Sequence, residues 1–168
     1  MKKRNRNSMI LALIGIVLIV LFMFIWGGRK MKYSVGKDIG IEDVTDFYYT
    51  YSSSAFPPEY QRYRFYVEDG KHYFYHEKRE GDTWPLREDH ITIFGTRILS
   101  DEEWQSFFEH LQGGTVQKRN EDVVDGDAGP WLYLYWKKDQ GKYQEFSFAS
   151  WNDRKAFEEY CIHLTEQP

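Results

Sequence analysis

The segment QRYRFYVEDGKHYFYHEK, from Gln61 to Lys78, decides the fold class of this chain. Apolar and polar residues alternate on both sides of the dipeptide Asp69-Gly70. This pattern predicts two antiparallel strands joined by a two-residue type I′ turn, in which both turn residues take a positive φ. Since side chains alternate between the two faces of a strand, each arm of the hairpin should present one apolar and one polar face.

Further strand-like segments lie on both sides of this hairpin. Runs of β-branched and aromatic residues predict strands at 44–51, 91–98, 115–119, 131–137 and 143–150. The connections between successive strands are short in most places, which favours antiparallel pairing. A mostly antiparallel sheet is therefore expected.

Two helices are predicted, each after a group of strands. Ser100 and Glu103 form a capping box at the start of the first, and Gly113-Gly114 ends it. The second begins at Ser150. Residues at helical spacing give each helix an apolar stripe. The stripes comprise Trp104, Phe107, Phe108 and Leu111, and then Phe157, Cys161 and Leu164, with Trp151 beside them.

This order of elements predicts the fold class. Four strands, a helix, three strands and a second helix follow one another, instead of single strands alternating with helices. That order is typical of an α+β domain, in which the helices pack on one face of an antiparallel sheet. We expect this domain to span residues 41–168, a usual size for one domain.

An uncharged apolar segment precedes the domain. MILALIGIVLIVLFMFIW, from Met9 to Trp26, would extend roughly 27 Å as a helix, close to the ~30 Å of a bilayer core. A cleaved signal peptide is the alternative, but the apolar run is long and no A-x-A-like site follows it. We therefore expect a short basic tail at 1–8, a transmembrane helix at 9–26 and a stem at 27–40.

The distribution of charge separates the stem from the domain. All 26 acidic residues lie at or after Asp38, where only 14 of the 22 Lys and Arg are found, so this part carries a net charge of −12. Such an acidic domain argues against a nucleic-acid partner. Comparison of the basic residues on both sides of the apolar segment favours a single-pass protein of the cell membrane with its C-terminal domain extracytoplasmic.

The sequence carries no catalytic or cofactor-binding motif. It contains neither a glycine-rich phosphate loop nor a nucleophile elbow, so no cofactor is expected. The one cysteine, Cys161, lies on an apolar helix stripe and is interpreted as a small core residue. His72 and His76 are four residues apart on a strand, roughly 13 Å, which is too far for one shared metal ion.

One loop is a weak candidate for a metal site. The segment NEDVVDGDAGP gathers carboxylates of the kind that hold calcium. These are Glu121, Asp122, Asp125 and Asp127. Their spacing differs from an EF-hand loop, so a solvated acidic loop is the simpler interpretation and no metal site is predicted.

Aromatic residues exceed what a core of this size needs, at 18% of the chain. Because strands alternate, about half of those in the sheet should lie on the face without helices. Such residues suit binding surfaces, although cross-strand packing alone would also explain them. The candidate binding residues are Trp84, Trp131, Tyr133 and Tyr135.

The function predicted from these features is a membrane-anchored, non-catalytic domain that binds a protein, peptide or glycan. One alternative is a membrane-anchored hydrolase that uses carboxylates unmarked by any motif. Another is a structural subunit of a membrane complex, in which the transmembrane helix makes the contact.

Overall fold

The computed structural model describes residues 10–19, 31–119, 129–137 and 142–166. The chain divides into two compact units, Met1–Met31 and Lys32–Pro168. In the first unit, residues 10–19 are helical. Met9 and residues 20–26 of the expected transmembrane segment lie outside the described residues. Within the described part of the chain, no helix is both long and apolar enough to cross a membrane.

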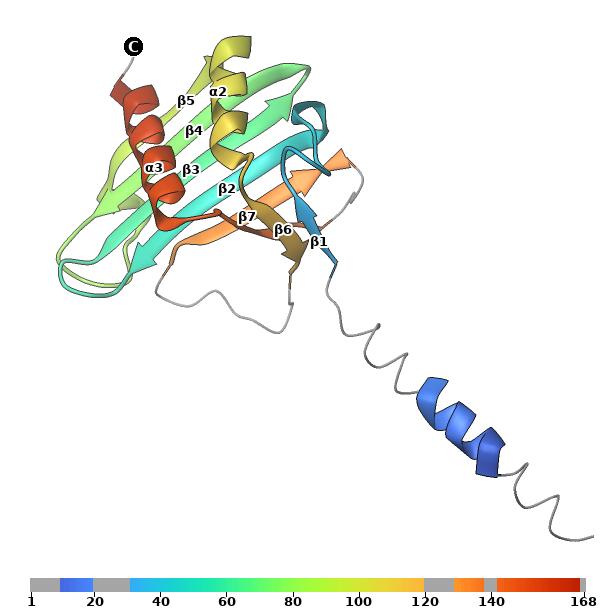
Figure 1. Ribbon diagram of the computed structural model, residues 1–168. Helices are drawn as coiled ribbons and strands as arrows, with labels where there is room; N and C mark the ends of the chain where they lie inside the picture. Colours follow the sequence, from blue (N-terminus) through green and yellow to red (C-terminus); the bar gives the residue numbers. More distant parts are fainter. Residues whose placement is uncertain (1–9, 20–30, 120–128, 138–141, 167–168) are drawn as a thin grey trace, which may run out of the picture. The chain divides into compact units, whose positions relative to one another are not determined.

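The second unit is an α+β domain with an eight-stranded antiparallel sheet (Figure 1). Its strands are β1 (Lys32–Ser34), β2 (Val44–Ser53), β3 (Glu59–Glu68), β4 (Lys71–Glu80), β5 (Ile91–Leu99), β6 (Thr115–Lys118), β7 (Trp131–Trp136) and β8 (Gln144–Ser147). The helices are α2 (Asp101–Leu111) and α3 (Trp151–Glu166), with short 3-10 turns η1 (Ile41–Asp43) and η2 (Glu88–His90). The four-strand, helix, three-strand, helix order predicted after residue 40 is confirmed.

The strand order is β1-β6-β8-β7-β2-β3-β4-β5. Strands β2 to β5 form a meander, and α2 carries the chain from β5, at one edge, to β6, near the other. β1 lies inside the segment for which the sequence predicts only a stem, and it pairs with β6 through Tyr33 and Val116. The sequence missed β1 because three residues are too few to show strand alternation.

The hairpin of β3 and β4 has the predicted turn. Asp69 and Gly70 have φ values of 50° and 73°, both positive as a type I′ turn requires. Glu68 pairs with Lys71 on either side of the turn, and Phe65 pairs with Phe74 further along. This register places the apolar residues of both arms on the same face of the sheet.

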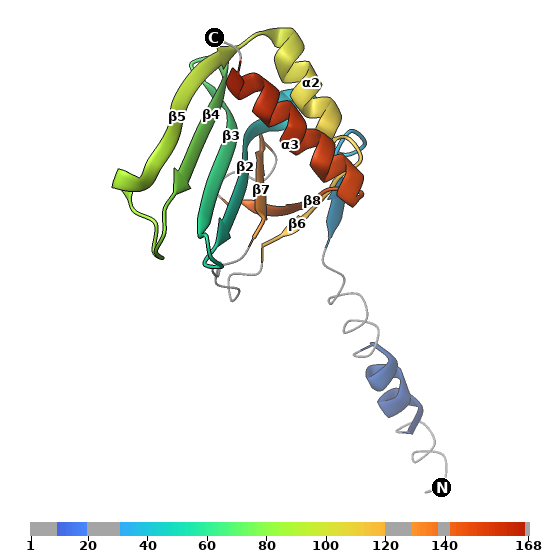
Figure 2. The ribbon, with the colours of Figure 1, turned by 90° about the vertical axis from the view of Figure 1, so that its left-hand side faces the viewer.

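Both helices cover that face (Figures 1 and 2). The capping box at the start of α2 is confirmed, since the Ser100 side chain accepts a hydrogen bond from the Glu103 amide. All seven residues predicted to form the two apolar stripes are buried. Trp151 was expected beside them, but it is 60% exposed and lies next to the Lys155 ammonium. It occupies the first position of α3.

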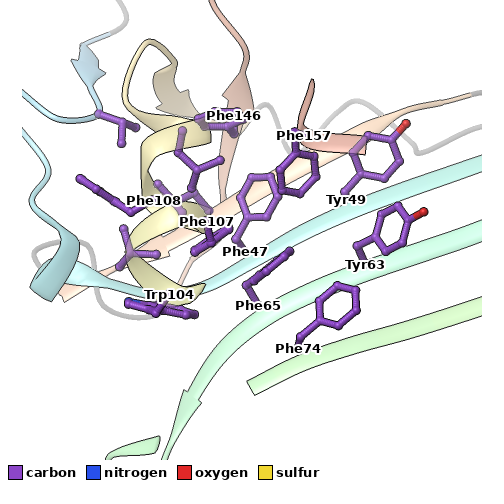
Figure 3. Packing of buried hydrophobic residues seen from close by; sticks show 14 of the residues in the cluster. Phe47, Tyr49, Tyr63, Phe65, Phe74, Trp104, Phe107, Phe108, Phe146 and Phe157 are labelled. Atoms are coloured by element: carbon purple, nitrogen blue, oxygen red, sulfur yellow. The ribbon is translucent and has the colours of Figure 1, made fainter. Parts of the chain in front are cut away.

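Phenylalanine rings from the sheet and both helices form the centre of the core (Figure 3). Phe65 stacks on Phe107 of α2, with ring centroids 4.0 Å apart. Phe47 contacts Phe107, Phe146 and Phe157 at centroid distances of 5.3 to 5.7 Å. Each fully buried ring contributes about 1.5–3 kcal/mol through burial alone. These contacts fix α2 and α3 on one face and leave the other face of the sheet free of helices.

Candidate functional site on the helix-free face

The helix-free face carries rows of aromatic and charged side chains. In β2, Phe47 and Tyr49 point into the core, so Tyr48 and Thr50 point to the helix-free face. The register continues these positions across the sheet. One row is Tyr133, Tyr48, Arg64, Tyr75 and Thr96; the next is Trp131, Thr50, Arg62, Glu77 and Phe94.

These rows enclose a hollow of about 350 Å³ over β7, β2 and β3. We call it the outer hollow. Its described lining consists of Tyr48, Thr50, Ser52, Arg62, Arg119, Trp131, Tyr133 and Tyr143. All eight side chains are half-buried, so each has a surface that a ligand can contact.

Tyr143 joins the aromatic part of the lining. Its ring contacts those of Tyr48 at 5.2 Å, Tyr133 at 6.2 Å and Tyr135 at 3.8 Å between centroids. Burial, reinforced by a hydrogen bond with Tyr48, raises the pKa of the Tyr143 phenol. The hydroxyl therefore stays protonated at physiological pH and remains a hydrogen-bond donor.

Arg62 is the most available cation in the outer hollow. Its Nε donates a hydrogen bond to Thr50 Oγ1 at 3.3 Å, and its guanidinium carbon lies 5.7 Å from the ring centroid of Tyr48. Among the described residues it forms no ion pair. Glu77, its cross-strand neighbour, is instead bound by Arg79 at 2.6 Å.

The neighbouring charges are already paired. Arg64 holds Asp46 with two nitrogens, Nε to Oδ1 at 3.1 Å and Nη2 to Oδ2 at 2.5 Å. Burial raises the pKa of Glu77, but hydrogen bonds from Tyr75 and Arg79 outweigh this effect and bring its pKa below the ordinary value. Each carboxylate forms its ion pair with its own arginine, and the charge of Arg62 makes only a smaller contribution to the lowered pKa of Glu77.

Arg119, which follows β6, supplies a second guanidinium. It lies 4.6 Å from the ring centroid of Tyr133, on the side of the outer hollow opposite Arg62. Two arginines and four large aromatic side chains thus surround one cavity. This combination provides charge-assisted hydrogen bonds and flat apolar surfaces together.

The structure brings some of the sequence-predicted binding residues together. Trp131 and Tyr133 line the outer hollow, and Tyr135 reaches it indirectly through Tyr143. Trp84 lies elsewhere, in the loop after β4, and two strands, β2 and β3, separate β4 from β7. It is partly exposed and does not belong to this cavity.

Sequence reasoning missed Tyr48, Arg62, Arg119 and Tyr143. Alternation within β3 does place Arg62 opposite the core face, which is a usable signal. The pairing of β7 with β2, however, joins segments about 80 residues apart, and no local pattern in the sequence reveals it.

The acidic-loop candidate Glu121, Asp122, Asp125 and Asp127 lies outside the described residues. In the parts of the chain that the structure does describe, no three His, Cys, Asp or Glu side chains are grouped so that they could hold a metal ion.

A second hollow of about 350 Å³ lies on the core face, beside α3. Its polar groups are mutually engaged: the Tyr49 hydroxyl donates to Glu158 Oε1 at 2.5 Å, and Arg154 Nε lies 3.4 Å from the same oxygen. Burial raises the pKa of Tyr49, and the hydrogen bond to Glu158 adds to this effect. Glu158 is thus held by two neighbours and is not free to act as a general base.

The thiol and the imidazole nearby are also unsuited to catalysis. Cys161 is fully buried, and burial raises its pKa well above that of an ordinary thiol. His76 is only 5% exposed. It lies under the Tyr63 ring, 4.6 Å away between centroids, because α3 covers this end of β4.

Comparisons with known proteins do not extend this description. No protein-family model, curated protein or solved structure matches the chain.

Proposed function

We propose that this chain is a membrane-anchored, extracytoplasmic binding domain that holds an anionic sugar in the outer hollow without transforming it. The observation that carries the proposal is the position of Arg62, a half-buried guanidinium without an ion-pair partner among the described residues, beside half-buried tyrosine and tryptophan side chains. Such an arginine binds carboxylate, sulfate or phosphate oxygens with two parallel hydrogen bonds.

The chemistry of the lining favours an anion over a cation. Aromatic cages bind cations through the faces of their rings. Here arginines already lie over the rings of Tyr48 and Tyr133. A cationic ligand would have to displace one of these guanidinium groups from its ring and would be repelled by the other guanidinium. An anionic group, in contrast, finds donors from Arg62 and from the hydroxyl of Thr50.

The shape of the lining favours a ring-bearing small ligand over an extended peptide. The outer hollow lies over β7, β2 and β3, all of which have a strand on either side. Their backbone groups are paired, so no peptide can add to them as a further strand. The volume of about 350 Å³ is at the lower end of the ~300–1,000 Å³ typical of small-molecule sites. One or two sugar rings that stack on tyrosine and tryptophan fit these constraints.

The described lining also favours binding without catalysis. None of its eight residues is Asp, Glu, His or Cys. It therefore offers no general base and no activated nucleophile of the usual kinds. The hydrolase alternative would need a carboxylate directed at the ligand. On this face Asp46 and Glu77 are held by Arg64 and Arg79, and Glu145 accepts a hydrogen bond from Gln117 at 3.1 Å.

The apolar segment Met9–Trp26 supports the membrane anchor in this proposal. It holds no charged residue over eighteen positions, and basic residues precede and follow it. Anchoring would keep the binding domain at the membrane surface, where the short stem limits how far it can reach.

A comparison of three probes tests the proposed function. The full-length chain in detergent micelles is titrated, by isothermal titration calorimetry, with a tetrasaccharide of alternating glucuronate and N-acetylglucosamine. The neutral N-acetylglucosamine tetramer and tetraglutamate serve as matched probes. Saturable binding of the acidic sugar, at least about tenfold tighter than of either other probe, is expected. Equal affinity for the neutral sugar would show that the ligand need not be anionic. Tighter binding of tetraglutamate would show that the site prefers an acidic peptide to a sugar. No binding of any probe would refute the proposal.

A further inference from the structure

Strand β5 forms an open edge of the sheet. Among the described strands it pairs only with β4, through eight of its nine residues, and Figure 2 shows no described element of the domain beyond it. The backbone N–H and C=O groups on its outer side therefore lack a strand partner. The opposite edge strand, β1, has only three residues, so β5 is the edge that could hold a further strand of useful length.

This edge carries little of the protection that is usual for an edge strand, namely one inward-pointing charge and one register shift beside Thr92. Natural edges carry lysine, proline or inward-pointing charges, or are very short. The sequence of β5, ITIFGTRIL, has a single charged residue, Arg97. Arg97 is turned to the helix side, where it donates to the Leu164 carbonyl oxygen at 3.2 Å and pairs with Glu103. Its charge is thus neutralised within the domain and does not guard the open edge.

Two large apolar side chains of β5 are exposed on the helix-free face. Phe94 is 68% exposed and Ile98 is 56% exposed. They lie four residues apart on the same face, with Thr96 between them. One edge of Phe94 is packed against Tyr75, at 5.6 Å between centroids, and the rest of its ring has no cover.

We propose that β5 pairs with β5 of a second copy of this chain, antiparallel and about a twofold axis through Thr96. Antiparallel pairing about an axis perpendicular to the sheet keeps each side chain on its own face. In this register Phe94 of each copy lies opposite Ile98 of the other, and Thr96 lies opposite its own counterpart. Both exposed apolar residues are then buried by one contact.

The second copy is the occupant that the strand itself specifies. An unpaired backbone edge requires an extended strand, and β5 is complementary to itself in the register about Thr96. On the helix side that register sets Gly95 opposite Arg97, so the smallest residue faces the largest. Strands β4, β3 and β2 separate this interface from β7, so pairing through β5 leaves the outer hollow open. The inference therefore does not depend on what the outer hollow binds.

Acidic residues near both ends of β5 oppose the pairing. Glu88 and Asp89 of η2 precede the strand, and Asp101 and Glu102 begin α2 directly after it. Antiparallel pairing brings the start of one strand near the end of the other, so these like charges approach each other. Since salt screens such repulsion, the dimer should tighten as the sodium chloride concentration rises.

Disulfide trapping of the full-length chain in detergent micelles tests the register. Thr96→Cys should form an oxidised dimer, because directly opposed residues have Cβ atoms about 4.5–5.5 Å apart. Thr92→Cys is the matched control: it is also exposed on β5, but in this register its two copies lie roughly 26 Å apart. The native Cys161 is fully buried in both variants.

The expected yield of oxidised dimer is at least about tenfold higher for Thr96→Cys than for Thr92→Cys. Thr96→Lys should convert the dimer to a monomer in light scattering coupled to size-exclusion chromatography, because two ammonium groups would then face each other. An unchanged circular dichroism spectrum would show that this variant is folded. Equal trapping at both positions, a monomeric wild-type chain, or a dimer that survives Thr96→Lys would each overturn the proposal.

Discussion

Arg62 Nε donates a hydrogen bond to Thr50 Oγ1 across 3.3 Å, between neighbouring strands of the sheet. The contact uses the nitrogen nearest the aliphatic stem of the arginine. Both terminal nitrogens of the guanidinium make no hydrogen bond to another described residue, so they are left to bind a ligand, and together they can form a fork with a carboxylate. Thr50 thus orients Arg62 in the outer hollow, and the following predictions begin with this pair.

Replacement of Arg62 by glutamine should weaken binding of the acidic tetrasaccharide by about 10- to 100-fold. Hydrogen bonds to charged groups are worth about 1.5–3 kcal/mol, and about 1.4 kcal/mol corresponds to tenfold in affinity. The affinity of Arg62→Lys should lie between those of wild type and Arg62→Gln, because an ammonium group keeps the charge but cannot form two parallel hydrogen bonds. Calorimetric titration measures these affinities.

The control for charge is Arg87→Gln. Arg87 is exposed and lies in the loop before η2, away from the outer hollow, and the substitution changes the net charge by the same amount. It should leave the affinity within about twofold of wild type. A loss as large as that of Arg62→Gln would mean that long-range charge, and not a direct contact, controls binding.

Replacement of Trp131 by alanine should weaken binding of the same sugar by about tenfold, since an aromatic contact contributes about 0.5–1.5 kcal/mol beyond its buried area. Trp84→Ala is the matched control, because Trp84 is partly exposed and lies outside the outer hollow. Fluorescence titration of both variants checks this difference. If Trp84→Ala lowered the affinity and Trp131→Ala did not, the binding site would lie at the loop after β4.

Replacement of Phe47 by alanine should lower the free energy of unfolding by about 3–5 kcal/mol, because it removes a fully buried ring that contacts three others. Phe56→Ala removes the same group from a loop position that is 82% exposed, and it should change stability by less than about 0.5 kcal/mol. Urea denaturation measures both values. Similar losses for the two variants would show that Phe47 is not at the centre of the core.

The stability of the domain should decrease with acid below neutral pH because of His76. Burial, with a smaller effect of Lys78, lowers the pKa of His76 to about 4. Thr165 Oγ1 donates to the Cys161 carbonyl oxygen at 2.9 Å, so it accepts from His76 Nδ1, also at 2.9 Å. Among the described residues, His76 Nε2 is then a buried nitrogen without a hydrogen-bond partner, and protonation there would place an uncompensated charge in the core.

The sign of this effect follows from proton binding. Between the unfolded pKa near 6.5 and the folded pKa near 4, the unfolded chain holds more protons on this histidine than the folded chain. Its contribution is therefore complete above about pH 6.5 and is lost as the pH falls to 4, by about 3 kcal/mol in total. Urea denaturation from pH 7 to 4 should show a shallower decrease for His76→Gln than for wild type. Parallel curves would mean that His76 is not the group responsible.

The full-length chain should remain in the membrane fraction after extraction with alkaline carbonate, whereas a chain that begins at Met31 should be released. The uncharged segment Met9–Trp26 is the part removed, and it supplies the apolar length that a bilayer requires. Immunoblots of the two fractions report the outcome. Release of the full-length chain by carbonate would show that the segment is not a membrane anchor. The proposal that the outer hollow binds an anionic sugar would not be affected.

Local signals in the sequence predicted most of the domain. Asp69-Gly70 specifies its turn because both residues tolerate positive φ, and Ser100 with Glu103 specifies a helix start through contacts three residues apart. The pairing of β7 with β2, in contrast, depends on packing between distant segments. Alternation therefore placed Trp131 and Tyr133 on one face, but their approach to Arg62 could not be read from the sequence.

The proposed binding site is tested most directly by a large side chain that fills the outer hollow. Thr50→Trp places an indole among the lining residues and removes the acceptor that orients Arg62, whereas Thr92→Trp adds the same group at an exposed position of β5, outside the hollow. Calorimetric titration of the full-length chain with the acidic tetrasaccharide is predicted to show saturable binding for wild type and Thr92→Trp and none for folded Thr50→Trp. Unchanged binding by Thr50→Trp, or no binding by wild type, would contradict the account.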